Sequence, residues 1–252
     1  MSSNEGFHKE DEMIAHLNNK KYGELSNNLR NMVRNLFEPM KLKEDDLISC
    51  HKVEGYLKPD FCLLCQGVEK FVSMKSGTAE CVHEEYVDLF VKRLEDAGIS
   101  KETIETILLY HYGDGTTDGS AEERIPYVTL RAMLDLRIQK ANLELNHDKD
   151  FVMKMMRHCI YVGSSERAIP IDAIYFGDYE YGNLATVRQL DRHFMVRDWK
   201  WINNLHIGPL MLRPHARYYG KEITNQKRRR TLEAYWPKLG NDIAFIAKRY
   251  DR

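Results

Sequence analysis

Two apolar stretches bring an acid and a base to the same end of a predicted β-hairpin. Asp60 opens the first stretch, Lys75 closes the second, and Gly67-Val68 lies between them. A Gly-X pair favours a two-residue type II′ turn, which would place Asp60 opposite Lys75. Because side chains alternate along a strand, Asp60, Ser73 and Lys75 share one face. The other face carries the apolar side chains of Phe61, Leu63, Val72 and Met74.

An ordinary cross-strand ion pair, worth about 0.2–1 kcal/mol, would explain the same two charged residues. Two details favour a site that a substrate can reach. Pro59 fixes the backbone before the acid, and Ser76-Gly77-Thr78 breaks the strand after the base. Both charged side chains therefore lie next to a polar loop.

The pattern Pro59-Asp60, followed after a gap by Ser73-Met74-Lys75, resembles the motif of the PD-(D/E)xK nuclease superfamily. That superfamily has the restriction-endonuclease-like fold. The resemblance implies that Asp60 binds Mg²⁺ and that Lys75 positions or activates the attacking water. The predicted order of helix, hairpin and helix over residues 10–97 also matches the superfamily.

Ser73 departs from the motif, because the superfamily usually has Asp or Glu at this position. Some of its members with serine there supply the missing carboxylate from the following helix, which we predict at 79–97. That helix would begin with Glu80, Glu84 and Glu85, of which Glu85 lies nearest the apolar face and is our choice. The alternative is that all three are first-turn acids favoured by the helix dipole. The superfamily often adds a glutamate from the helix before the hairpin, and Glu24 stands at that place.

The chemistry of phosphodiester hydrolysis suits these residue types. Mg²⁺ prefers carboxylate oxygens and polarises the phosphate, and Mn²⁺ could substitute for it. A nearby ammonium group lowers the cost of forming hydroxide and of developing negative charge. We therefore expect Asp60, Glu85 and Glu24 to hold the metal, with Ser73 and Lys75 as further catalytic residues.

The last quarter of the chain is basic. From Arg197 to Arg252 there are 13 Lys and Arg against 5 Asp and Glu, whereas the whole chain has a net charge of −1. A basic segment suits a polyanion such as nucleic acid, although a solvated basic surface has the same composition. The predicted nucleic-acid-binding residues are Arg213, His215, Arg217, Lys227, Arg228, Arg229 and Arg230.

The function that these observations predict is a Mg²⁺-dependent endonuclease acting on double-stranded DNA, similar to a type II restriction endonuclease. A homodimer would fit cleavage of both strands. The alternative is a nucleic-acid-binding protein on the same fold that has lost catalysis through the change at Ser73. A third hypothesis is an interaction protein whose acidic and basic parts associate.

The periodicity predicts a single α/β domain over residues 1–252. The fold class is a restriction-endonuclease-like core (10–97), with a central mixed β-sheet flanked by helices and with additional helices in the C-terminal half. The basic region 197–252 would contact nucleic acid. Outside the core we expect helices after Ser100 to about 112 and at about 127–145, 148–160, 184–195, 228–236 and 241–250, and strands at 169–176 and 205–214.

Several features argue against other classes of protein. The first residues, MSSNEGFHKEDEM, contain no apolar segment, and no run approaches the roughly 20 apolar residues of a membrane span. The five cysteines are an odd number, which favours reduced thiols in the cytoplasm. Cys62 and Cys65 would point to opposite faces of a strand, so they do not suit one metal. His83 is expected to pack on the apolar face of its helix.

Overall fold

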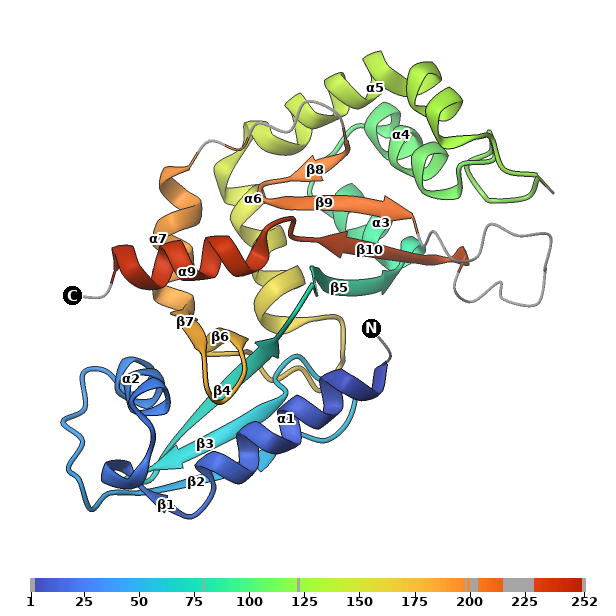
Figure 1. Cartoon of the computed structure of the whole chain (residues 1–252). Helices are drawn as coiled ribbons and strands as arrows, with labels where there is room; N and C mark the ends of the chain where they lie inside the picture. The colour runs from blue at the N-terminus through green and yellow to red at the C-terminus, as the bar shows by residue number, and fades with distance from the viewer. Residues whose placement is uncertain are drawn as a thin grey trace. The chain divides into compact units, whose positions relative to one another are not determined.

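The computed structural model describes residues 3–78, 80–121, 123–197, 199, 204–214 and 229–250, in two compact units (Figure 1). Unit 1 comprises Met1–Ala79, Ile160–Val196 and Lys238–Arg252, and unit 2 comprises Glu80–Cys159 and Arg197–Pro237. The expected core over residues 10–97 is therefore divided, because its hairpin belongs to unit 1 and its last part to unit 2. Each unit has its own sheet.

The sheet of unit 1 is mixed and has six strands in the order β1-β2-β3-β4-β6-β7. The strands β2, β3 and β4 form an antiparallel meander, β6 runs parallel to β4, and β7 is antiparallel to β6. Their bounds are β1 Lys20–Lys21, β2 Leu47–Lys52, β3 Phe61–Cys65, β4 Val68–Lys75, β6 Ala173–Gly177 and β7 Gly182–Thr186.

Helices cover both faces of this sheet. The helices α1 (Ser3–Leu17) and α2 (Asn27–Leu36) share a buried core with alternate residues of the strands, including Phe61, Val72 and Tyr175. The helix α9 (Leu239–Arg249) packs on the other face, where Gly240 lies against the ring of Phe176. The helix α7 (Val187–Val196) packs against α9 and β7. Unit 1 is thus an α/β structure with a mixed sheet and flanking helices, as the sequence predicts.

Local signals explain where several helices begin. The side chain of Ser26 accepts a hydrogen bond from Leu29 N and caps α2, whose buried residues recur every three or four positions. Ser100 caps α4 (Lys101–Tyr112) in the same way, through Thr103 N. The strand β1 and the short helix η1 (Tyr22–Glu24) separate α1 from α2.

The sheet of unit 2 is antiparallel, with the strand order β5-β10-β9-β8. Its strands are β5 Cys81–Tyr86, β8 His206–Ile207, β9 Leu210–Pro214 and β10 Thr231–Tyr235. Its helices are α3 Val87–Asp96, α4, α5 Tyr127–His147 and α6 Lys149–Met156, and the π-helical turn η2 (Arg157–Val162) follows α6. The helices α3, α4 and α5 all contact this sheet.

Four of the helices and strands predicted from the sequence differ from those in the structure. Residues 81–86 form a strand where we expected the first half of a helix, and residues 231–235 form its strand partner where we expected another helix. Residues 182–186 are also a strand, so the helix expected from 184 begins at Val187. The single strand expected over 205–214 is a hairpin whose turn is Gly208-Pro209. The sequence analysis also missed β2.

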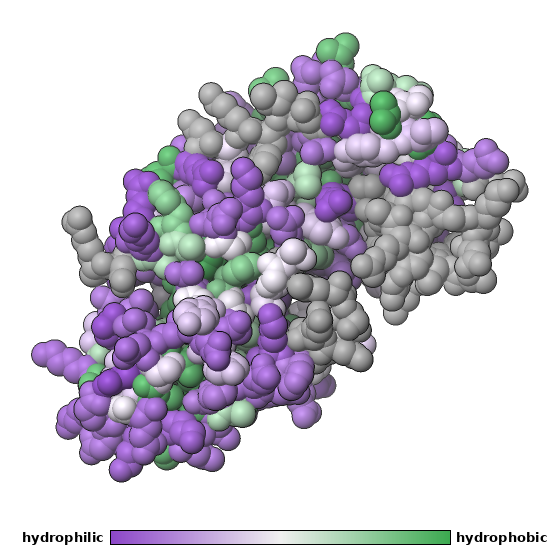
Figure 2. All heavy atoms as spheres, viewed as in Figure 1, coloured by the Kyte–Doolittle hydropathy of each residue, from purple (hydrophilic) through white to green (hydrophobic). Residues whose placement is uncertain are grey.

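No described helix is both long enough and apolar enough to cross a membrane. Hydrophilic side chains cover most of the surface over α1 and α2 on the face that Figure 2 shows. All five cysteines lie within the described residues, and they form no disulfide.

Candidate functional site

The hairpin forms, but its turn is one residue earlier than predicted. Cys65 pairs with Val68, so the two-residue loop is Gln66-Gly67 and not Gly67-Val68. Both loop residues have positive φ, 49° and 79°, which is the signature of a type I′ turn and suits the right-handed twist of the strands. The register moves by two residues, so Asp60 lies opposite Ser73 and not Lys75. A shift of two preserves the faces, and Asp60, Ser73 and Lys75 stay on one side.

Asp60 is held by three groups of strand β4. Its Oδ2 atom accepts hydrogen bonds from Ser73 Oγ at 3.1 Å and from Met74 N at 2.5 Å. Lys75 Nζ lies 3.6 Å from the same oxygen. Ser73 is buried, whereas the side chains of Asp60 and Lys75 are 21% and 25% exposed. The carboxylate is therefore fixed in orientation and still accessible to a small ligand.

A second carboxylate, that of Glu10 on α1, lies near this cluster. Its Oε2 atom is 3.6 Å from Lys52 Nζ at the end of β2, and its side chain is 17% exposed. Burial raises the pKa of Glu10 above its ordinary value, and the charge of Asp60 raises it further. Lys52 and Lys75 lower the pKa of Glu10, but they do not outweigh the first two effects. Asp11 Oδ1 also lies 3.0 Å from Lys52 Nζ, so three acids and two bases interact at one end of the sheet.

Glu24 was predicted to fill this role, but the structure places it elsewhere. Glu24 ends η1, and its exposed carboxylate accepts a hydrogen bond from Lys21 N. Lys21 pairs with Leu47, the first residue of β2, whereas Asp60 bonds to Val53, just beyond the last residue of β2. At about 3.3 Å per residue these two points are about 20 Å apart along the strand. Glu24 therefore lies at the opposite end of β2 from Asp60.

The sequence did contain a signal for Glu10. Met13 and Leu17 are buried on α1, and Glu10 stands one helical turn before Met13 on the same side. A carboxylate that continues an apolar stripe in this way lies where the helix covers the edge of a core. Glu24 was predicted from the segment before the hairpin, and Glu10 was not considered.

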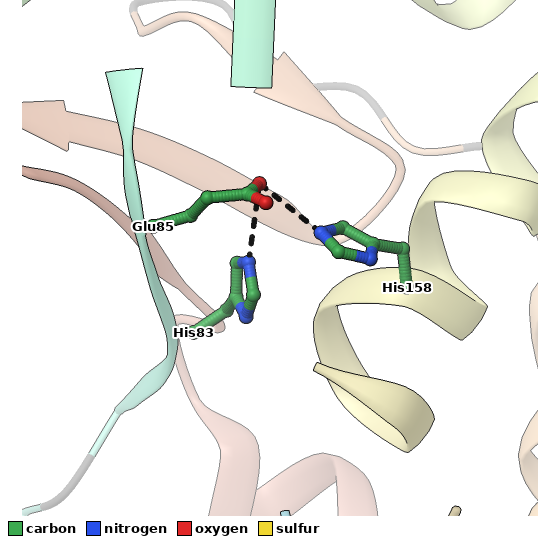
Figure 3. Close-up of side chains that lie close together, drawn as sticks. All are labelled: His83, Glu85 and His158. Atoms are coloured by element: carbon green, nitrogen blue, oxygen red, sulfur yellow. Dashed lines mark hydrogen bonds and ion pairs between the residues drawn. The ribbon is translucent and has the colours of Figure 1, made fainter. Parts of the chain in front are cut away.

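Glu85 belongs to a different cluster, within unit 2. Because β5 is a strand, His83 and Glu85 are two residues apart and point to the same side. His158 reaches the same carboxylate from η2 (Figure 3). Glu85 Oε2 lies 3.1 Å from His158 Nε2 and 3.5 Å from His83 Nε2, while Arg93 Nε lies 3.2 Å from Oε1. His83 is thus buried, as expected, but on a strand and beside a carboxylate.

This buried carboxylate is strongly stabilised as an anion. Burial by itself raises the pKa of Glu85, but hydrogen bonds from His158 and His83 and the charges of these two residues outweigh it. Together they hold the pKa of Glu85 well below its ordinary value. The sequence analysis missed His158 because it is distant in the chain. It missed the pairing of His83 with Glu85 because it placed both residues on a helix.

Three of the predicted nucleic-acid-binding residues lie among the described residues. Arg213 is exposed on β9, and its guanidinium lies 4.4 Å from the centre of the Tyr235 ring. Arg230 is exposed. Arg229 Nη2 donates to Asp114 Oδ2 at 2.6 Å and to the carbonyl of Ala121 at 3.0 Å. The other four predicted residues, His215, Arg217, Lys227 and Arg228, lie outside the described residues.

Asp114 holds the glycine-rich loop that follows α4 in place. This buried carboxylate accepts hydrogen bonds from Thr116 N and Thr116 Oγ1 in addition to Arg229. Such bonds are typical of an aspartate in a turn. Asp114 therefore fixes the loop to the segment that precedes β10.

No protein-family model matches this chain, and no curated protein matches it either.

Proposed function

We propose that the cluster of Asp60, Lys75 and Glu10 is the active site of a metal-dependent endonuclease that hydrolyses phosphodiester bonds of double-stranded DNA. The observation that carries the proposal is the contact of Lys75 with a fixed Asp60 carboxylate, close to a second carboxylate. The resemblance of the hairpin to the PD-(D/E)xK motif supports the same function. We propose the restriction-endonuclease-like core for unit 1 on the same basis.

The donor groups fit a hard cation such as Mg²⁺, with Mn²⁺ as a substitute. Asp60 and Glu10 offer carboxylate oxygens, which these ions prefer. Burial raises the pKa of Glu10 and the charge of Asp60 raises it further, and a bound cation would relieve the repulsion between the two carboxylates. When bound, the cation polarises the phosphate that is attacked.

The protein's own groups have distinct parts in this mechanism. Asp60 and Glu10 would hold the cation, and Ser73 orients Asp60 by donating a hydrogen bond to it. The ammonium group of Lys75 lowers the cost of deprotonating the attacking water, and it offsets negative charge on the phosphate oxygens. Glu10 takes the place that the sequence analysis gave to Glu24 and Glu85.

For binding to DNA, exposed basic residues of unit 2 are the proposed phosphate contacts. Arg213 and Arg230 are exposed, so they can reach phosphate oxygens without burying a charge. Arg229 bonds to Asp114, which favours a role in holding the loop. A homodimer would present two sites to the two DNA strands. Reduced cysteines suit a protein of the cytoplasm.

The second candidate is a nucleic-acid-binding protein without catalysis. Ser73 favours it, because this position carries an acid in most of the superfamily and here carries a buried hydroxyl that serves Asp60. A hydroxyl is a poor ligand for Mg²⁺ compared with a carboxylate.

A cleavage assay tests the first candidate. Supercoiled plasmid is incubated with the wild type, Asp60→Asn, Glu10→Gln and Lys75→Met, in Mg²⁺, in Mn²⁺ and in EDTA. We expect metal-dependent cleavage by the wild type and a loss of at least about 100-fold in each variant. The matched control is Lys70→Met, because Lys70 is also on β4, is 27% exposed and pairs with an aspartate, Asp172, at 2.8 Å.

Each result separates the candidates. Cleavage that survives in Lys70→Met but not in Lys75→Met supports the active site. Cleavage that also survives in Asp60→Asn and Lys75→Met contradicts it. A protein that does not cleave but retards DNA in a gel, with an affinity that falls steeply as salt rises, is the binding protein. A protein that neither cleaves nor binds DNA would contradict both candidate functions.

A further inference from the structure

The cluster of His83, Glu85 and His158 in unit 2 has the composition of a transition-metal site. Two imidazoles and one carboxylate converge, and their ligand atoms all lie within 4.8 Å of one another. The side chains are 3%, 0% and 13% exposed, respectively. The proposed nuclease mechanism does not use this cluster.

The distances from the Glu85 carboxylate to the two imidazoles are close to those of a tetrahedral ion. Zn²⁺ binds histidine nitrogen and carboxylate oxygen at about 2.0–2.2 Å, so neighbouring ligands of a tetrahedral site are about 3.3–3.5 Å apart. Glu85 Oε2 lies 3.1 Å from His158 Nε2 and 3.5 Å from His83 Nε2. Figure 3 shows both rings turned toward this one carboxylate.

The backbone holds these ligands firmly. His83 and Glu85 lie in β5, where they pair with Ala234 and Leu232 of β10. His158 lies in the π-helical turn η2, and such turns occur often at functional sites. A strand and a helical turn position ligands more firmly than a loop does.

Arg93 contacts the carboxylate of Glu85 from the side away from the two histidines' oxygen. Its Nε atom contacts Oε1 of Glu85, whereas the two histidines contact Oε2. A ligating carboxylate is commonly oriented by a hydrogen bond to its other oxygen. Arg93 therefore leaves Oε2 available to a metal. The competing explanation is a buried network in which Glu85 pairs with Arg93, His83 and His158 and binds no ion.

We propose that His83, Glu85 and His158 form a binding site for a divalent transition-metal ion of the zinc class. A set of two nitrogens and one oxygen suits Zn²⁺, Co²⁺ or Fe²⁺ better than Mg²⁺ or Ca²⁺, which prefer oxygen ligands alone. Three protein ligands leave a fourth position open for water or a substrate atom.

The test is a titration of the untagged, metal-stripped full chain with Zn²⁺, with Mg²⁺ in large excess to occupy oxygen sites. Calorimetry gives the stoichiometry and affinity, and Co²⁺ gives visible absorption bands typical of a tetrahedral site. We expect one Zn²⁺ per chain and a loss of affinity of at least about 100-fold in His83→Gln, Glu85→Gln and His158→Gln. Arg93→Gln should weaken binding by about tenfold.

Two control variants make the result specific. His147→Ala removes an exposed histidine of unit 2 and should bind Zn²⁺ as the wild type does. Asp60→Asn should also bind it normally, so the metal site and the proposed nuclease can fail independently. The proposal is overturned if the wild type binds no Zn²⁺, if Co²⁺ gives no visible bands, or if the three ligand variants keep wild-type affinity. The Co²⁺ spectrum decides the question even where a ligand variant fails to fold.

Discussion

Glu10 lies close enough to Asp60 that, in addition to burial, the charge of Asp60 raises the pKa of Glu10, although 50 residues separate the two in the chain. Asp60 precedes β3, Glu10 lies on α1, and the packing of α1 against β2 brings them together. Like charges so close to each other weaken the folded state unless a cation lies near them. Repulsion between two carboxylates is typical of a binding site, where a lower stability of the empty protein accompanies affinity for the ligand.

Glu10→Gln is expected to stabilise the metal-free protein at neutral pH by roughly 0.5–1 kcal/mol. The folded pKa of Glu10 is raised, so its contribution to stability is fully present below its ordinary pKa of about 4.3 and is lost as the pH rises through the folded pKa. Urea unfolding at pH 7 measures the effect, with Glu12→Gln on the same helix as the control. Addition of Mg²⁺ should stabilise the wild type and not Glu10→Gln. An unchanged or lower stability of Glu10→Gln without metal would contradict this prediction.

Ser73→Asp tests the departure from the nuclease motif. A third carboxylate placed against Asp60 at a buried position should destabilise the metal-free protein by about 2–4 kcal/mol, and Mg²⁺ should restore much of this loss. Ser73→Ala removes only the hydrogen bond to Asp60, so it should cost about 1 kcal/mol and show no such rescue. Thermal unfolding with and without Mg²⁺ compares the two variants. A Ser73→Asp protein that Mg²⁺ does not stabilise would argue against a cation beside Asp60.

The hairpin shows how far local sequence can predict a site. Its two strands and its two faces follow from alternation, and the faces are confirmed because Phe61, Leu63, Val72 and Met74 all belong to one core cluster with α1 and α2. The turn was misplaced because Gly67-Val68 suits a type II′ turn, whereas the chain uses Gln66 in the left-handed region. A non-glycine residue at positive φ costs energy that local preference does not predict.

The elements that were predicted wrongly depend on distant pairing. Val82 and Tyr86 stand at helical spacing from Phe90 and Leu94, which predicts a helix. Residues 81–86 nevertheless pair with β10, about 150 residues further along the chain. In such cases the contacts between paired strands outweigh the intrinsic preference of the segment for a helix. The same pairing places His83 and Glu85 on one side, so a cluster with His158 could not be read from the sequence. Both clusters thus depend on contacts between distant segments.

Gly67→Ala tests the corrected turn. The φ angle of Gly67 is 79°, and nothing lies within 4 Å of an added Cβ atom, so only backbone strain should oppose alanine. We expect a loss of about 1–2 kcal/mol in the free energy of unfolding. Gly98→Ala is matched, because Gly98 has φ of 77° and equally open space, but it lies in unit 2. Chemical unfolding should give similar losses for the two variants, and a neutral Gly67→Ala would contradict the turn.

Glu144→Gln should weaken the junction between α4 and α5 in a pH-dependent way. The carboxylate of Glu144 accepts hydrogen bonds from Ser100 N at 2.7 Å, Ser100 Oγ at 2.6 Å and Thr103 Oγ1 at 2.5 Å. Burial raises the pKa of Glu144, but these hydrogen bonds outweigh it and lower the pKa below its ordinary value. The contribution of Glu144 to stability is therefore present above about pH 4.3 and is lost as the pH falls through the folded pKa.

At about pH 7 we expect Glu144→Gln to lose about 1 kcal/mol, since solvent screens these partly exposed bonds. The difference from the wild type should shrink at about pH 3, because this pH lies below the ordinary pKa of about 4.3 of a glutamate. Urea unfolding at both pH values measures this change. Glu95→Gln, an exposed position on α3, is the control and should change little at either pH. An equal loss of stability at both pH values would contradict the prediction. It would mean that the shape of the Glu144 side chain, and not its charge, holds this junction.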